Sequence, residues 1–228
     1  MNRSLLSALG AAALAVLFSA GAGTSQSLAD FDYENLTFRG LSLEGGYLSA
    51  TRVDPAYSIG TRIDLGYLGP GLRIVPGVSY WSSTMKSSEV RELEDKVESL
   101  IDAELPPGAS TPQVNLGTID WSDIALTLDG HFVWSVPYDL LTFAGAGVSA
   151  HILNGEGDAI AGTFVEDLLD SVAAGLNLHA GLEYPLHDRF RLYGVGRYEV
   201  LEDLRYLEFR LGGQIMFAPP APGEERSR

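Results

Sequence analysis

The sequence contains no cysteine. This absence excludes a disulfide framework and a cysteine-linked lipid anchor. Lysine is almost as scarce, because Lys86 and Lys96 are the only two and every other basic side chain is an arginine. A folded domain in this chain must therefore be held together by packing, by hydrogen-bonded ladders or by a membrane.

Positive charge is also in short supply. Lys and Arg number 15 against 30 Asp and Glu, which gives a formal net charge of −15 at pH 7. This balance disfavours nucleic acid as a partner, since binding to a phosphate backbone needs clustered positive charge. The hydrophobic fraction of 46% is in turn too high for a disordered chain.

Long apolar runs are confined to the first residues. Arg3 is followed by an apolar run from about Leu5 to Phe18 and then by small residues, a pattern typical of a secretory signal. We predict a signal peptide over residues 1–29, cleaved after Ala22 or Ala29. The run is shorter than the roughly 20 apolar residues of a membrane-spanning helix, and no later stretch reaches that length. We therefore expect no helical membrane span.

Alternation of apolar and polar residues with period two dominates the sequence from Phe38 onward, and such alternation is typical of strands with two different faces. Eight segments of about the length of a tilted membrane strand show it. They are Phe38 to Ala50, Tyr57 to Leu68, Leu72 to Ser82, Trp121 to Trp134, Leu140 to Leu153, Ala173 to Tyr184, Arg189 to Val200, and Leu204 to Phe217.

The connections between these segments alternate between tight turns and looser links. Gly69 to Gly71, Ser135 to Asp139 and Pro185 to Asp188 are tight, whereas two excursions, Ser83 to Asp120 and Asn154 to Val172, are long. An up-and-down chain that crosses a membrane repeatedly has this form, with short turns in the periplasm and long loops outside. We predict an all-β fold, an eight-stranded antiparallel up-and-down transmembrane β-barrel over residues 30–217. Residues 218–228 are predicted to be a disordered periplasmic tail.

Both long excursions contain helix-like patterns. Their apolar residues recur at helical spacing among acidic ones. The two stripes are Val90, Leu93, Val97, Leu100 and Ile101 in the first excursion, and Ile160, Phe164, Leu168 and Val172 in the second. Each helix either packs on the rim of the barrel or serves as a mobile lid or docking helix, and we favour packing.

Charged residues in the middle of the segments indicate which face points inward. The basic ones are all arginines, and they nearly balance the carboxylates, as a confined network requires because an unpaired buried charge is costly. We predict that they line the lumen: Glu44, Arg62, Asp64, Arg73, Asp123, Asp129, Glu183, Arg189, Arg191, Arg197, Glu199, Glu208 and Arg210. A soluble lipocalin-like barrel, with the apolar face inside, is the rival interpretation.

Aromatic residues on the apolar face support the membrane interpretation, because they fall near the segment ends. Two interfacial girdles are predicted. The turn-side girdle contains Tyr67, Trp134, Tyr184, Phe190 and Phe217, and the loop-side girdle contains Tyr47, Tyr57, Tyr80 and Tyr198.

With these features the chain resembles the small outer-membrane barrels of the OmpA transmembrane-domain and OmpX type. The resemblance includes the last segment, whose outward residues are Phe209, Leu211, Gly213, Ile215 and Phe217. It implies insertion by the barrel-assembly machinery and residence in the bacterial outer membrane.

Candidate sites for chemistry are few. His131, His151 and His179 fall on the predicted lumen face, but His131 and His151 are expected roughly 20 Å apart along the strands, too far to share an ion. His131 and His179 are closer in height and are the better pair for coupled titration. Ser149 and His151 lie two apart on one face, yet their spacing supplies neither the acid nor the oxyanion donors of a hydrolase. We therefore expect no metal, no cofactor and no catalytic residue.

The function expected from the sequence is that of a non-enzymatic envelope protein, in which the barrel is an anchor and the outer loops serve envelope integrity or surface interaction. Expected partners are outer-membrane lipid, lipopolysaccharide and the assembly machinery, with the protein a monomer. Two alternatives stay open at this point: a narrow channel or carrier for small or apolar ligands, and a barrel enzyme that modifies lipid A.

Overall fold

The computed structural model describes residues 31–106, 110 and 113–218. The predicted signal peptide lies outside the described residues, as does the predicted tail after Ala218. A short 3-10 helix, η2 (Tyr33–Asn35), precedes the first strand.

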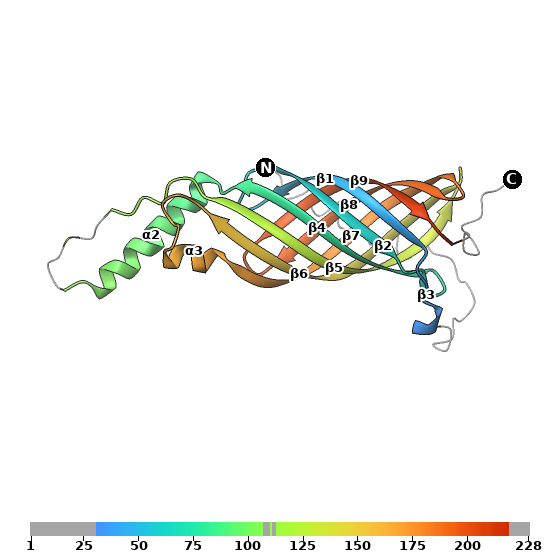
Figure 1. Cartoon of the computed structure of the whole chain (residues 1–228), viewed down its shortest axis with the longest axis horizontal. Helices are drawn as coiled ribbons and strands as arrows, with labels where there is room; N and C mark the ends of the chain where they lie inside the picture. Colours follow the sequence, from blue (N-terminus) through green and yellow to red (C-terminus); the bar gives the residue numbers. More distant parts are fainter. Residues whose placement is uncertain (1–30, 107–109, 111–112, 219–228) are drawn as a thin grey trace, which may run out of the picture. The chain divides into compact units, whose positions relative to one another are not determined.

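One antiparallel sheet closes on itself to form the barrel (Figure 1). Its order is β2-β1-β9-β8-β7-β6-β5-β4-β3, and an additional pairing of β2 with β4 closes it. The strands are β1 (Gly40–Ala50), β2 (Ala56–Asp64), β3 (Tyr67–Gly69), β4 (Leu72–Thr84), β5 (Asp120–Val136), β6 (Leu140–Glu156), β7 (Ser171–His187), β8 (Phe190–Leu201) and β9 (Arg205–Met216).

The segments β2 and β3 are two parts of one barrel strand. Gly66 has φ +77°, a conformation that glycine adopts without a Cβ penalty, and it breaks the strand there. The backbone remains tied to β4, because Leu65 N–H donates to the carbonyl of Ile74 at 3.0 Å and Ile74 N–H donates to that of Gly66 at 2.9 Å. The predicted eight-stranded up-and-down barrel is thus confirmed.

Three strands are longer than the sequence pattern predicts. β5, β6 and β7 each have 17 residues. A tilted strand needs only about 9–11 residues to cross the hydrocarbon layer. Relative to the predicted segments the extra residues lie at both ends of the barrel, and on the loop side the outward side chains include the polar Ser122 and Asn154.

Side chains alternate between the two faces with the apolar ones outside. On β7, for example, Leu176, Leu178 and Leu182 are exposed, while Asn177 and His179 between them are buried. A soluble barrel has the opposite arrangement, since its apolar face fills the interior. The structure therefore supports the membrane interpretation over the lipocalin-like one.

An apolar cluster lies at the loop end of the barrel and combines residues from strands and loops. Its buried members are Leu48, Ala50, Val53, Ala56, Trp81, Met85, Val90, Val97, Leu116, Ile119, Trp121, Leu153, Ile160, Val165, Leu169, Leu201, Leu204 and Tyr206. We call it the loop-end cluster. The two helices of the long loops, α2 (Ser87–Glu104) and α3 (Phe164–Leu169), lie at this end of the barrel (Figure 1).

Helix α2 packs as the sequence predicts. Val90 and Val97 are buried in the loop-end cluster, with Leu93 and Ile101 packed against it, although Leu100 is 61% exposed. Two glutamates fix the helix to the returning chain: Val114 N–H donates to Glu98 at 2.8 Å, and Leu116 N–H donates to Glu94 at 2.9 Å.

The predicted stripe of the second excursion is wrong in part. Ile160 is buried, but Phe164, Leu168 and Val172 are exposed, and α3 instead buries Val165 and Leu169. The reason is that α3 begins only after Thr163, whose side chain caps it by accepting a hydrogen bond from Val165 N–H. Ile160 precedes the helix and is not in helical phase with the residues after it. In the described part of the chain, neither helix is long and apolar enough to span a bilayer.

Candidate functional site

Arg73 is the centre of a cluster of charged side chains in the lumen near the tight turns. Its guanidinium forms two hydrogen bonds with the carboxylate of Glu183 and lies 3.7 Å from that of Asp64. It also donates to Nδ1 of His131 at 3.2 Å. All four side chains are buried, and charge-assisted pairs of this kind are the stronger hydrogen bonds in proteins. This end of the barrel is therefore filled by side chains paired with one another.

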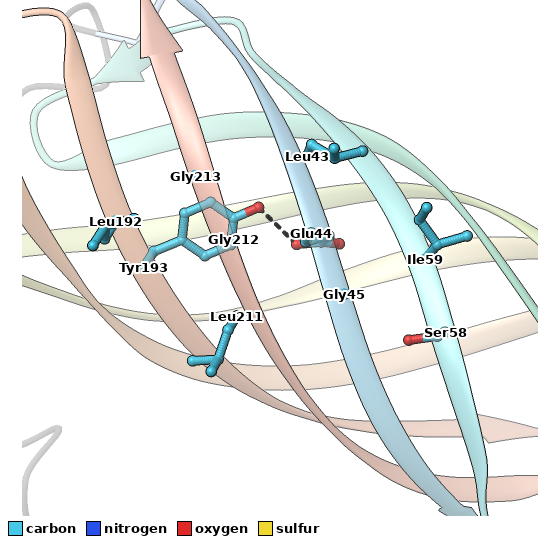
Figure 2. A pocket seen from close by; sticks show the side chains of 10 residues that line it. All are labelled: Leu43, Glu44, Gly45, Ser58, Ile59, Leu192, Tyr193, Leu211, Gly212 and Gly213. Atoms are coloured by element: carbon cyan, nitrogen blue, oxygen red, sulfur yellow. Dashed lines mark hydrogen bonds between the residues drawn. The ribbon is translucent and has the colours of Figure 1, made fainter.

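A second cluster centres on Glu44. Arg210 donates to this carboxylate at 2.7 Å, the Nε of Arg62 lies 3.0 Å from it, and the hydroxyl of Tyr193 donates to it at 2.9 Å. Figure 2 shows the tyrosine reaching from β8 past Gly212 of β9 to Glu44 of β1. The three residues form one row of the sheet, because Gly212 is paired with both Tyr193 and Glu44. The ring occupies the place that a Cβ at position 212 would take, so glycine is required there.

A third cluster joins β5, β7 and β8. Arg197 donates to Asp129 at 2.7 Å and to Glu199 at 2.8 Å, and Asn177 donates to the other oxygen of Asp129 at 3.1 Å. The carboxylates of this cluster thus have cationic or amide donors within the barrel.

His151 and its neighbours correct one expectation from the sequence. Nδ1 of His151 lies 2.7 Å from Oδ2 of Asp123, and Nε2 lies 3.0 Å from Oγ of Ser149. Asp123 thus supplies the acid that the spacing of Ser149 and His151 did not reveal. The arrangement has the connectivity of a serine-histidine-acid triad.

The hydrogen bonds around this triad oppose catalysis. The Ser149 hydroxyl donates to Oε1 of Glu199 at 2.5 Å, so its oxygen is left to accept from Nε2 of His151. With Asp123 at the other nitrogen, the ring donates on both sides and has no lone pair to remove a proton from serine. Asp123, His151 and Glu199 are at most 1% exposed. We interpret the group as a structural ion-pair network.

Asp129, His131 and His179 form the one group in the described part of the chain whose ligand atoms lie close enough to hold a metal, within 4.8 Å of one another. The ring centroids of His131 and His179 lie 4.7 Å apart, in agreement with the predicted proximity of the two residues. Arg73 donates to His131, however, and Arg197 and Asn177 occupy the carboxylate of Asp129. A cation here would displace these bonds and face two arginines. We assign no ion to the group.

Of the thirteen residues predicted to line the lumen, twelve are buried and one is not. Arg189 is exposed in the turn between β7 and β8, one residue before β8 begins, so it is not part of the network. Arg39 is a buried arginine that the alternation does not predict. Its odd position would place it on the same outward face as Leu41 and Leu43, but it precedes the first strand, where the alternation does not hold. The predicted set also lacks the neutral partners Tyr193, Ser58 and Asn177, since only charge singled out its members.

Eight of the nine aromatic residues predicted for the two girdles are more than a third exposed and face outward. Tyr67 is the exception, because it is paired with the lumen-facing Arg73 and is half-buried beneath the guanidinium of Arg39 at 5.4 Å. Tyr47 and Tyr57 touch edge to face on the loop side, where their ring centroids lie 5.6 Å apart.

Little space is left in the part of the lumen around Arg73. A cavity between Arg62, Arg73 and His131 has a volume of about 10 Å³, enough for about one water molecule. The hollow shown in Figure 2 is larger, about 620 Å³, but open, and apolar residues such as Leu43, Ile59 and Leu211 border it on the outward face.

Comparison with known proteins gives structural matches only. No protein-family model matches the chain, and no curated protein matches it. Neisserial surface protein A is similar with a TM-score of 0.50 and 14% sequence identity, over 78% of this chain and 97% of that one. A major outer membrane protein from Thermus thermophilus matches with a TM-score of 0.46 and 14% identity, over 78% and 99% of the two chains. Ail of Yersinia pestis matches with a TM-score of 0.45 and 11% identity, over 80% and 100%.

The closed antiparallel sheet, the apolar outer face and the ionic interior together define a membrane β-barrel of the outer-membrane type. Within that class, the chain has the fold of the small eight-stranded barrels, of which Neisserial surface protein A is a solved example.

Proposed function

We propose that this protein is a non-enzymatic component of the bacterial outer membrane, in which a rigid barrel anchors two structured surface loops that serve envelope integrity or surface interaction. The observation that supports this most is the filled lumen. Five arginines and seven carboxylates of the predicted network are buried inside the barrel and pair across it. A structure so filled is suited to anchoring more than to transport, since eight strands enclose only enough space for side chains.

The loop-end cluster supports the same proposal. It covers the ionic interior with apolar residues from strands and from both long loops, including Trp81, Val97 and Leu169. A channel or a carrier would need this cluster to open. We expect the outer loops to contact lipopolysaccharide and neighbouring lipid, and we expect the protein to be a monomer inserted by the barrel-assembly machinery.

The test combines location with conductance. The full chain is expressed in a Gram-negative host, the outer membrane is isolated, and folded protein is identified by a shift on detergent gels between unheated and boiled samples. The purified protein is then recorded in planar bilayers. We expect the heat-dependent shift in the outer-membrane fraction and no steady conductance. Protein that stays soluble without detergent, or a large stable conductance, would overturn the proposal.

Lipid A from the same cells distinguishes the enzyme alternative. We expect the mass spectrum of lipid A to be unchanged by overproduction of the protein. A new acylation state that depended on Ser149 would show that the triad is catalytic.

A further inference from the structure

Helix α3 presents an apolar surface that has no partner in the described part of the chain. Phe164 is 57% exposed, Leu168 is 62% exposed and Val172 is 78% exposed. The three recur every fourth residue, so Phe164 and Leu168 lie one above the other on the helix. We call them the α3 stripe.

The orientation of α3 is fixed by the barrel. Val165 and Leu169 are buried in the loop-end cluster. Trp121 donates from its ring to the carbonyl of Leu169 at 3.3 Å, and Gly155 N–H donates to Asp170 at 3.0 Å. The stripe is therefore held on one side of the helix, next to the buried face.

The stripe continues the lipid-facing surface of the barrel. Val172 lies at the start of β7, paired with the outward Ile152 of β6. Below it on the same face of β7 come Leu176 and Leu178, which are 66% and 65% exposed. The exposed apolar residues of β7 thus lead up to Val172, and Leu168 and Phe164 of α3 follow beyond Asp170 and Ser171.

The loop-side aromatic girdle has a gap on this side of the barrel. Tyr47, Tyr57, Tyr80 and Tyr198 belong to β1, β2, β4 and β8. The strands β5, β6 and β7 are described in full, and no aromatic residue faces outward on their loop-side halves. Phe164 lies above this sector, because α3 connects β6 to β7.

We infer that α3 is an interfacial helix, with Phe164 and Leu168 inserted into the outer leaflet of the membrane. Away from the stripe the helix carries Glu166 and Asp167, which suits a helix that lies in the interface with its charged side toward water. Phe164 then completes the girdle above β5, β6 and β7. The second long loop is on this basis part of the membrane contact, and α2 is the one of the two described loop helices that projects from it. The inference rests on the proposed membrane anchoring.

Spin labelling tests whether α3 lies in the membrane. The chain contains no cysteine, so a thiol-specific label attaches only to the cysteine that is introduced. The full-length variants Leu168→Cys, Phe164→Cys, Asp167→Cys and Leu178→Cys each receive a thiol-specific nitroxide and are reconstituted into vesicles of phosphatidylcholine and phosphatidylglycerol. Collision rates with oxygen, which concentrates in lipid, and with a water-soluble nickel chelate are then measured. We expect the oxygen-to-nickel ratio at 168 and 164 to be several-fold higher than at 167 and similar to that at 178.

Labels at 164 and 168 with the same ratio as the label at 167 would overturn the inference and leave the stripe as a surface for water or a protein partner. A label at 178 exposed to nickel would instead show that β7 is not in lipid, and the membrane anchoring itself would fail.

Discussion

The hydroxyl of Tyr193 donates a 2.9 Å hydrogen bond to Glu44, a residue 149 positions earlier in the chain. The bond crosses an entire strand, β9, at the point where that strand has Gly212. Through it, the last part of the chain is tied to the first strand on the inner surface of the barrel. The closure of the barrel is thus reinforced by side chains as well as by the backbone ladder between β1 and β9.

The substitution Gly212→Ala tests this crossing. A Cβ at position 212 would collide with the Tyr193 ring and come within 2.8 Å of the carbonyl oxygen of Leu43. We expect the free energy of unfolding, measured by urea titration in lipid vesicles, to fall by about 1–3 kcal/mol, the usual cost of overpacking. Gly45→Ala is the control, since its nearest atom is the carbonyl oxygen of Ser58 at 3.9 Å. Equal stability of the two variants would contradict the prediction.

Arg210 is predicted to be the most costly arginine of this cluster to remove. It donates to Glu44 at 2.7 Å, to Glu208 at 2.6 Å and to Ser79 at 3.2 Å. The variant Arg210→Met leaves buried carboxylates without this partner, and we expect a loss of about 3–5 kcal/mol in the free energy of unfolding.

The exposed Arg205 at the loop-side end of β9 gives the matched control. Arg205→Met should change the free energy of unfolding by no more than about 0.5 kcal/mol. If uncompensated charge is the cause, the double variant Arg210→Met/Glu208→Gln should regain part of the loss. No regain, or an Arg210→Met variant as stable as the control, would show that the buried charges are compensated in another way.

Alternation in the sequence predicts the barrel well because one rule decides each strand position. A residue faces either lipid or lumen. Its odd or even position along the strand (its parity) is therefore enough to place Leu178 outside and His179 inside. The rule fails where the strand ends. Arg39 precedes β1 and Arg189 precedes β8, and both turn to the side opposite to the one that parity predicts.

The contacts between side chains in the lumen are harder to predict from the sequence than the identity of the residues that line it. Asp123 and His151 are 28 residues apart, and their contact depends on how β5 and β6 are paired. Parity places both inside but says nothing of register between strands. The phase of α3 was missed for a similar reason, because it depends on the cap at Thr163 and on packing against Gly155 and Trp121, which lie on other strands.

Ser149 is predicted to be unreactive although it belongs to a triad. Its hydroxyl donates to Glu199, and His151 is held between two carboxylates. We expect that a fluorescent fluorophosphonate probe does not label the folded protein. The fluorescence of the protein band on a gel should equal that of the Ser149→Ala variant, which serves as the control. Labelling that the alanine variant abolished would demonstrate a serine nucleophile and make the protein an enzyme.

Helix α2 offers a test of how the loop-end cluster relates to the barrel. Val97 is buried and Leu100 is exposed, although they lie three residues apart on the same helix. The variant Val97→Asp places an unpaired carboxylate in the apolar cluster, which should release α2 from the chain at Val114 and Leu116 because burying an unpaired charge is costly. We expect faster cleavage of α2 by an added protease in intact vesicles, with the heat-dependent gel shift of the barrel unchanged. Leu100→Asp should be cleaved at the rate of the parent protein, because its side chain already meets water. If Val97→Asp also abolished the gel shift, the loop and the barrel would form one cooperative unit, and the cluster would have to be regarded as part of the core that folds the strands.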